Sequence, residues 1–229
     1  MGSEMCIRDR AEAEADYLAP SLYEAIEDNE NWPLLTVDGV TKRTRNGKSI
    51  RQDNEKATGH VLSLSAVREI TLNGESKKPI VLPDGEARQY AINVGDVFVS
   101  RSNTRELVGL ASVAESAPIR VIYPDLLIKL EVDESLIRPR YLAYSLRTIS
   151  SRRQIKDRAV GTSQSMVKIS AGRLKEVTIR VPSLSVQDKL LEQLNQCQTL
   201  SLEILSEIQR SDSAHLRDAI LRKAFAGEL

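Results

Sequence analysis

The sequence contains little cysteine and little histidine, which leaves few residues for the commonest metal and disulfide chemistries. Cys6 and Cys197 lie far apart and form no CxxC pair, and His60 and His215 show no spacing that suits a metal site. Cysteines without a partner motif are typical of reduced thiols in the cytoplasm. We therefore expect a cytoplasmic protein without bound metal.

Long apolar runs and enzyme motifs are also missing. No apolar run approaches the ~18 residues of a membrane-spanning helix, and the N-terminus lacks the apolar core of a signal peptide. The sequence has no Walker A motif and no glycine-rich loop after a strand that would bind a nucleotide or a methyl donor. Pro83-Asp84 and Pro124-Asp125 lack the Glu-x-Lys that a metal-dependent nuclease would place after them. The sequence predicts a binding module without catalytic residues or cofactor.

Net charge is absent as well, because 32 basic residues balance 32 acidic ones, but the charges are unevenly distributed. Residues 138–180 hold eleven Lys and Arg against two acidic residues, whereas residues 1–30 hold nine acidic residues against two Arg. A basic excess beside acidic segments is typical of a module that binds a polyanion on one face. A solvated helix surface could have the same composition, so charge alone leaves both interpretations open.

The chain from residue 161 to 194 shows three patterns in succession. Residues 161–165 (GTSQS) are polar and predict a loop, and the alternation of Val177, Ile179 and Val181 predicts a half-buried strand. Pro182 ends that strand, and Ser183 or Ser185 can cap the helix that follows. The predicted order is polar loop, strand and long helix.

The last segment predicts a helix that needs a partner. No Gly or Pro occurs between Ser183 and Gly227, and a helix of ~40 residues would be ~60 Å long. Such a helix cannot pack on a small domain along its whole length, so its apolar stripe favours coiled-coil pairing with another helix. A break near residues 211–213, giving a helical hairpin, stays open. The predicted helix-pairing residues are Leu190, Leu194, Cys197, Ile204, Ile208, Leu216 and Ile220.

The segment between residues 31 and 184 predicts a mixed domain. Apolar stretches at residues 61–64, 70–72, 79–83, 97–99, 107–114, 120–123 and 126–130 predict short strands, and residues 141–151 predict a helix. Residues 41–56 are polar and basic and predict a surface loop. The expected fold class is α+β: a small mixed domain of short strands and helices, followed by a long C-terminal coiled-coil helix.

Three motifs then point to a family. Residues 95–101 are GDVFVSR, residues 161–164 are GTSQ and precede a strand that ends in Val-Pro, and residues 216–229 are LRDAILRKAFAGEL. In this order, over about residues 32–229, they resemble the DNA-specificity subunit of type I restriction–modification enzymes. The resemblance implies a target-recognition domain over residues 31–184 and a pairing helix over residues 185–229. Residues 11–30 predict an N-terminal helical segment, and residues 1–10 resemble a translated sequencing-adapter artefact.

The resemblance implies a non-catalytic subunit that binds half of a bipartite site in double-stranded DNA. Its partners would be modification (methyltransferase) subunits, which carry the methyl donor, and a restriction/translocase subunit. A chain with one recognition domain could form a homodimer through its C-terminal helix. The acidic N-terminal segment followed by Trp32-Pro33 also resembles the end of an earlier helix, so the chain could equally be a C-terminal half.

Polar and basic loops supply the candidate DNA contacts, because Lys and Arg bind phosphates while Arg, Asn, Gln, Ser and Thr read base edges. The GTSQ segment could instead be a structural turn, with base-reading residues elsewhere between residues 42 and 120. The candidates are Lys42, Arg43, Arg45, Arg101, Ser102, Asn103, Arg105, Thr162, Ser163, Gln164 and Lys168.

Two other functions fit the same sequence. The chain could be the recognition domain of a fused methyltransferase or nuclease whose catalytic part lies outside this sequence. It could also be a coiled-coil adaptor without a role in DNA binding, although the basic segment and the two polar loops count against this. Gene context would distinguish a fused enzyme from a specificity subunit, and a DNA-binding assay would distinguish an adaptor from a specificity subunit.

Overall fold

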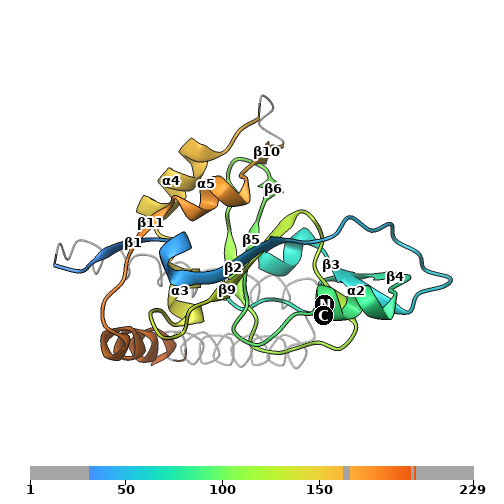
Figure 1. The fold of residues 1–229 in the computed structure, drawn as a ribbon, viewed down its shortest axis with the longest axis horizontal. Helices are drawn as coiled ribbons and strands as arrows, with labels where there is room; N and C mark the ends of the chain where they lie inside the picture. The colour runs from blue at the N-terminus through green and yellow to red at the C-terminus, as the bar shows by residue number, and fades with distance from the viewer. Residues whose placement is uncertain (1–30, 162–165, 197–198, 200–229) are drawn as a thin grey trace, which may run out of the picture. The chain divides into compact units, whose positions relative to one another are not determined.

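Short strands form several small sheets, and short helices lie beside them (Figure 1). The computed structural model describes residues 31–161, 166–196 and 199. The chain divides into a unit of Pro20–Leu191, to which the fold described below belongs, and a unit of Met1–Ala19 with Glu192–Leu229. The elements in chain order are β1 (Leu34–Thr36), η1 (Asp38–Val40), β2 (Thr41–Asn46), β3 (Gly59–Leu62), η2 (Leu64–Val67), β4 (Lys77–Ile80), α2 (Asp84–Gln89), β5 (Val97–Ser100), β6 (Ser102–Asn103), β7 (Ala111–Val113), β8 (Val121–Ile122), β9 (Leu127–Val132), α3 (Pro139–Ser145), α4 (Ile149–Arg158), β10 (Val167–Lys168), α5 (Ala171–Lys175) and β11 (Thr178–Arg180).

The largest sheet has the strand order β2-β9-β5-β7, and all its pairs are antiparallel. Its two central strands are the most apolar, and every residue of β5 is buried. The Phe98 ring of β5 meets the Tyr123 ring edge-on, with 5.1 Å between ring centroids. This contact lies in the main apolar core, to which the residues after β3 and before β9 also contribute. The mixture of strands and helices confirms the α+β prediction.

A second sheet, β4-β3-β8, carries the other apolar cluster of the domain. Strand β3 pairs antiparallel with β4 and parallel with β8. Val61, Ile80, Leu82 and Ile122 are buried together in this cluster. The strands predicted near residues 61, 80 and 121 are therefore present, with shifted ends.

The two ends of the mixed domain meet in a small sheet of β1 and β11, which are antiparallel. Beyond the ladder, the Val37 N–H donates to the Val177 carbonyl at 2.9 Å, and the Val181 N–H donates to the Pro33 carbonyl at 2.9 Å. The strand predicted before Pro182 is confirmed as β11. Because residues 33–37 and 177–181 are paired, the chain enters and leaves the domain at the same place.

Three predictions from local pattern are wrong. Residues 70–72 form no strand, and only Thr71 makes a single bridge, to Val113. Residues 41–46 form strand β2 and not a loop, because β9 pairs with the backbone on one side of the strand while its polar side chains stay at least partly exposed. The helix predicted over residues 141–151 is interrupted between α3 and α4. Thr148 caps α4, since its hydroxyl accepts from the Ser151 N–H at 3.3 Å and donates to the Ser145 carbonyl at 2.9 Å.

The C-terminal helix is described only at its beginning. Residues 184–196 are helical, and Leu190 and Leu194 of the predicted pairing stripe are buried. The other pairing residues, Cys197, Ile204, Ile208, Leu216 and Ile220, lie outside the described residues, as do the segments 1–10 and 11–30. Coiled-coil pairing and the domain boundaries therefore stay predictions.

Two further observations concern the described residues alone. None of their helices combines the length and apolar character needed to cross a bilayer. They also hold no cluster of three or more His, Cys, Asp or Glu side chains placed to bind a metal ion.

Candidate nucleic-acid interface

The two polar segments predicted to contact DNA lie side by side. Strand β6 pairs antiparallel with β10, so that Ser102 is opposite Lys168 and Asn103 is opposite Val167. Some 65 residues of sequence separate the two strands, and no local pattern indicated that they would pair. Figure 1 shows β6 and β10 together, with α4 and α5 next to them. This ribbon of β6 and β10 is the candidate interface.

The segment 162–165 begins and ends at this ribbon. Val160 and Lys168 exchange two backbone hydrogen bonds of 2.8 Å, and Gly161 and Met166 are the described residues on either side of the segment. A side chain at Gly161 would place its Cβ 2.7 Å from the Met166 carbonyl oxygen, so this position needs glycine. The glycine of the GTSQ motif therefore has a structural role, while Thr162, Ser163 and Gln164 lie outside the described residues.

The candidates on the β6 side differ in exposure. Arg101 joins the two segments, because its carbonyl accepts from the Ile169 N–H at 2.9 Å and its guanidinium donates to the Asp125 carbonyl at 3.4 Å. Ser102 is only 3% exposed, so it faces the interior and not a ligand. Asn103 is partly exposed, and its side-chain oxygen accepts from the Thr104 N–H at 2.9 Å. The Lys168 side chain is exposed and makes no hydrogen bond or ion pair within the described part of the chain.

The candidates on β2 form a separate group. β2 is an edge strand, and β9 lies between it and β5, the strand that leads into β6. Lys42 lies 3.7 Å from Asp133, with a side chain that is 63% exposed. Arg45 donates to the Gln89 carbonyl at 2.8 Å, and Arg43 is exposed. The sheet therefore does not bring the β2 group onto the ribbon of β6 and β10.

The basic segment 138–180 uses much of its charge inside the domain. Arg147 donates to the Ala111 carbonyl at 2.6 Å and to the Arg68 carbonyl at 2.8 Å, which ties the segment after α3 to β7 and to the residues after η2. Arg173 donates to the Arg158 carbonyl at 2.8 Å. The net charge of the segment therefore overstates the positive charge that it presents to a ligand. The side chains of Arg153 and Lys168 are exposed, and neither side chain forms a hydrogen bond or ion pair with another described residue.

The Gly-Asp of the first motif is part of a turn and of a buried ion pair. Gly95 has φ of 86°, a conformation that favours glycine. The Asp96 carboxylate accepts from the Asn93 N–H at 2.8 Å and from the Lys129 ammonium at 3.1 Å. Burial raises the pKa of the Asp96 carboxyl, whereas the Asn93 N–H and Lys129 act in the opposite direction. Asp96 thus connects the start of β5 to β9 as a structural residue.

Gln187 lies in the first turn of the C-terminal helix and connects that helix to the domain. Its side chain is fully buried, and its oxygen accepts from the Arg138 N–H at 2.8 Å. Its amide nitrogen donates to the Leu136 carbonyl at 3.0 Å and to the Pro182 carbonyl at 2.8 Å. Beside it, Asp188 accepts two hydrogen bonds from the Arg138 guanidinium, at 2.7 and 2.8 Å. These contacts fix the start of the C-terminal helix to the loop before α3.

Comparison with known proteins gives a consistent result. A family described as "Type I restriction modification DNA specificity domain" matches residues 29–210. The "Putative type I restriction enzyme MjaX specificity subunit" of Methanocaldococcus jannaschii is 23% identical over 203 residues, which is 86% of this chain and 46% of that protein. The "Type I restriction enzyme EcoEI specificity subunit" of Escherichia coli is 22% identical over 169 residues, which is 73% of this chain and 28% of that protein. The chain therefore spans less than half the length of these curated relatives.

A solved structure shares the fold. The crystal structure of the HsdS subunit from Thermoanaerobacter tengcongensis matches 97% of this chain and 53% of its own, with a TM-score of 0.57 and 18% sequence identity. At this identity the likeness concerns the fold and not individual contacts. The mixed α+β arrangement expected from the motifs is therefore also found in that structure.

Proposed function

This chain belongs to the type I restriction modification DNA specificity family, and we propose that it is a non-catalytic specificity subunit, or part of one, that reads half of a bipartite DNA site. The observation that carries the proposal is the pairing of β6 with β10, which brings together the residues that follow two of the motifs and leaves Lys168 exposed and Asn103 partly exposed.

In this proposal the ribbon of β6 and β10 lies against the duplex. Lys168, exposed and without an internal partner, contacts a phosphate, which fixes position without reading sequence. Asn103 and the residues 162–164 carry amide or hydroxyl groups that can both donate and accept hydrogen bonds at base edges. Arg101 holds the two segments in register, since its backbone and side chain bridge β6, β10 and the loop before β9.

The β2 candidates form a second contact region in the proposal. Arg43 is exposed on an edge strand, and Lys42 is held only by a 3.7 Å contact with Asp133. Basic side chains in this arrangement suit the phosphate backbone on another part of the site. Two separate groups of basic residues would let the domain follow the DNA over more than one groove.

The C-terminal helix would connect the recognition domain to the rest of the complex. The relatives matched here are about twice this length or more, so the second half of the site would be read by a second copy of this chain or by another domain. The contacts of Gln187 and Asp188 hold the first turn of this helix against the loop before α3. Modification subunits, which carry the methyl donor, and a restriction/translocase subunit would bind around this helix in the cytoplasm, where the DNA is.

The family match favours this function over a coiled-coil adaptor without a DNA role, and a binding assay separates the two. We would measure the affinity of the full chain for mixed-sequence duplex DNA at low salt, alongside Lys168→Gln and Lys189→Gln. Lys189 is an exposed lysine of the C-terminal helix and serves as the matched control. The proposal expects binding by the wild type, a loss of several-fold in Lys168→Gln and no change in Lys189→Gln. A folded wild type that binds no DNA would refute it.

A further inference from the structure

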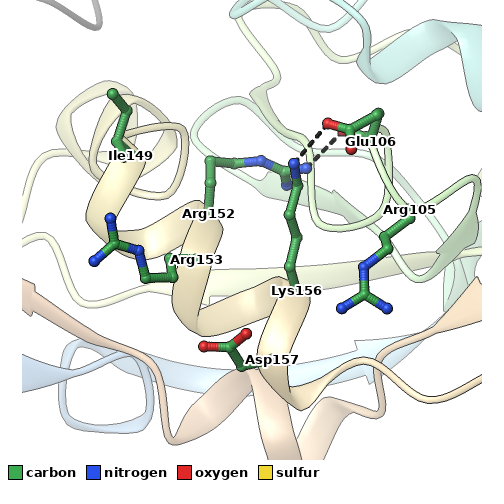
Figure 2. A pocket seen from close by; sticks show the side chains of 7 residues that line it. All are labelled: Arg105, Glu106, Ile149, Arg152, Arg153, Lys156 and Asp157. Atoms are coloured by element: carbon green, nitrogen blue, oxygen red, sulfur yellow. Dashed lines mark hydrogen bonds and ion pairs between the residues drawn. The ribbon is translucent and has the colours of Figure 1, made fainter.

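A basic depression lies beside the ribbon of β6 and β10, where α4 packs near the loop that follows β6. It is an open hollow with a volume of about 490 Å³ (Figure 2). Four basic and two acidic side chains line it, so it carries an excess of positive charge. The lining residues are Arg105, Glu106, Ile149, Arg152, Arg153, Lys156 and Asp157.

Arg152 gives the depression a fixed positive charge. Its guanidinium donates to the Val108 carbonyl at 2.5 Å and to the Glu106 carbonyl at 2.7 Å, which ties α4 to the loop after β6. Burial, together with the nearby Arg147, lowers the pKa of Arg152 to about 10. Because this value is well above neutral, the group stays charged at physiological pH, and its bonds to backbone hold it in place.

Two other guanidinium groups of the depression are available to a ligand. Arg105 and Arg153 are exposed, and neither side chain forms a hydrogen bond or ion pair within the described ranges. Figure 2 shows them on either side of Lys156, with Arg105 on the loop and Arg153 on α4. Glu106 and Asp157 offset only part of the positive charge of the four basic side chains, so the depression favours an anion.

Lys156 already forms an ion pair with Glu106. Its ammonium lies 2.6 Å from the Glu106 carboxylate, which is 77% exposed. The hydrogen bond from Lys156 lowers the pKa of Glu106, so the carboxylate is charged at neutral pH. An exposed ion pair of this kind contributes little to stability and can be exchanged for a stronger anion.

We propose that this depression binds a phosphodiester group of the DNA backbone without regard to sequence, with Arg105 and Arg153 as its contacts. A guanidinium can donate two parallel hydrogen bonds to one phosphate, which suits both side chains to this role. Glu106 holds Lys156 in the free protein and competes with the phosphate. Arg105 therefore contacts backbone and not bases, unlike its expected role in a base-reading loop. This inference rests on the proposed DNA-binding function and adds a contact that neither motif contains.

The salt dependence of DNA binding tests the proposal. We would compare wild type, Arg105→Gln and Arg153→Gln on mixed-sequence duplex, with Arg88→Gln, an exposed arginine of α2, as the control. Each lost phosphate contact should make the negative slope of log K, the DNA-binding constant, against log salt concentration shallower by about 1, and it should weaken binding equally for all sequences. Arg88→Gln should keep the wild-type slope.

The outcomes separate this inference from the function on which it rests. If the wild type binds DNA and both depression variants keep its slope, the phosphate site is refuted while the DNA-binding function stands. If the folded wild type binds no DNA at low salt, both are refuted.

Glu106→Gln provides a second test, in which DNA affinity should rise and not fall. The substitution frees Lys156 and leaves the Glu106 carbonyl, which holds Arg152, in place. We expect a salt slope that is steeper by about 1 and an affinity that is several-fold higher. Unchanged affinity would contradict the competing role of Glu106. Circular dichroism of each variant checks that the fold is retained.

Discussion

Removing the side-chain amide of Gln187 should loosen the C-terminal helix from the domain. The side chain is fully buried and makes three hydrogen bonds, to the Arg138 N–H and to the carbonyls of Leu136 and Pro182. At about 1 kcal/mol for each, Gln187→Ala should lower the free energy of unfolding by about 3 kcal/mol. With an m-value of ~2 kcal/mol/M, the urea midpoint would fall by about 1.5 M.

Two further variants give this measurement its control. Gln193→Ala removes the same side chain from an exposed position of the same helix and should change the midpoint by little. Gln187→Met keeps the approximate volume but removes the hydrogen bonds, so it should lose nearly as much stability as Gln187→Ala. Urea unfolding followed by far-ultraviolet circular dichroism measures all three. If Gln187→Met is as stable as the wild type, the hydrogen bonds do not hold the helix and the reasoning is wrong.

Three other predictions concern single sites. Asp96→Asn and Lys129→Met each break the buried ion pair and should each lower the free energy of unfolding by about 3 kcal/mol. The double variant should lose less than the sum of the two single losses. Additive losses in urea unfolding would contradict a direct interaction between the two side chains. Gly161→Ala should lower the free energy of unfolding by about 1–3 kcal/mol and weaken DNA binding, because the new Cβ would clash with backbone atoms. Gly172→Ala in α5 is the control, since its Cβ would meet only the Ser170 hydroxyl at 4.0 Å and should be tolerated. Equal melting temperatures of the two variants would refute this prediction. Ser102→Ala should leave DNA affinity unchanged and stability equal or higher, since the buried hydroxyl has no hydrogen-bond partner among the described residues; a large loss of affinity would restore Ser102 as a contact.

Local pattern predicted the strands that carry apolar side chains. Val97, Phe98 and Val99 read as a buried strand and form the centre of the largest sheet. The strand before Pro182 and the helix after it were also found, because the proline that ends the strand acts over only a few residues. Strand β2 could not be found in this way, since its stability comes from backbone pairing with β9, more than 80 residues away.

The candidate site was only partly predictable for the same reason. The sequence identified the residues of both β6 and β10, but their pairing is a long-range contact that no local pattern encodes. Burial of Ser102 and the internal use of Arg147 follow from packing around them, which composition does not reveal. The basic depression was missed because Arg105 and Arg153 are 48 positions apart and line the same hollow only when α4 packs near the loop after β6.

The central claim is that this chain reads DNA sequence, and selection from a pool of randomised duplexes tests it most directly. The full chain would be bound to the pool at moderate salt, and the retained duplexes would be sequenced over several rounds, with molar mass measured on the same sample. We predict enrichment of one short sequence, repeated with fixed spacing if the chain dimerises. A folded protein that retains duplexes without enriching any sequence, or that retains none at low salt, would contradict the claim.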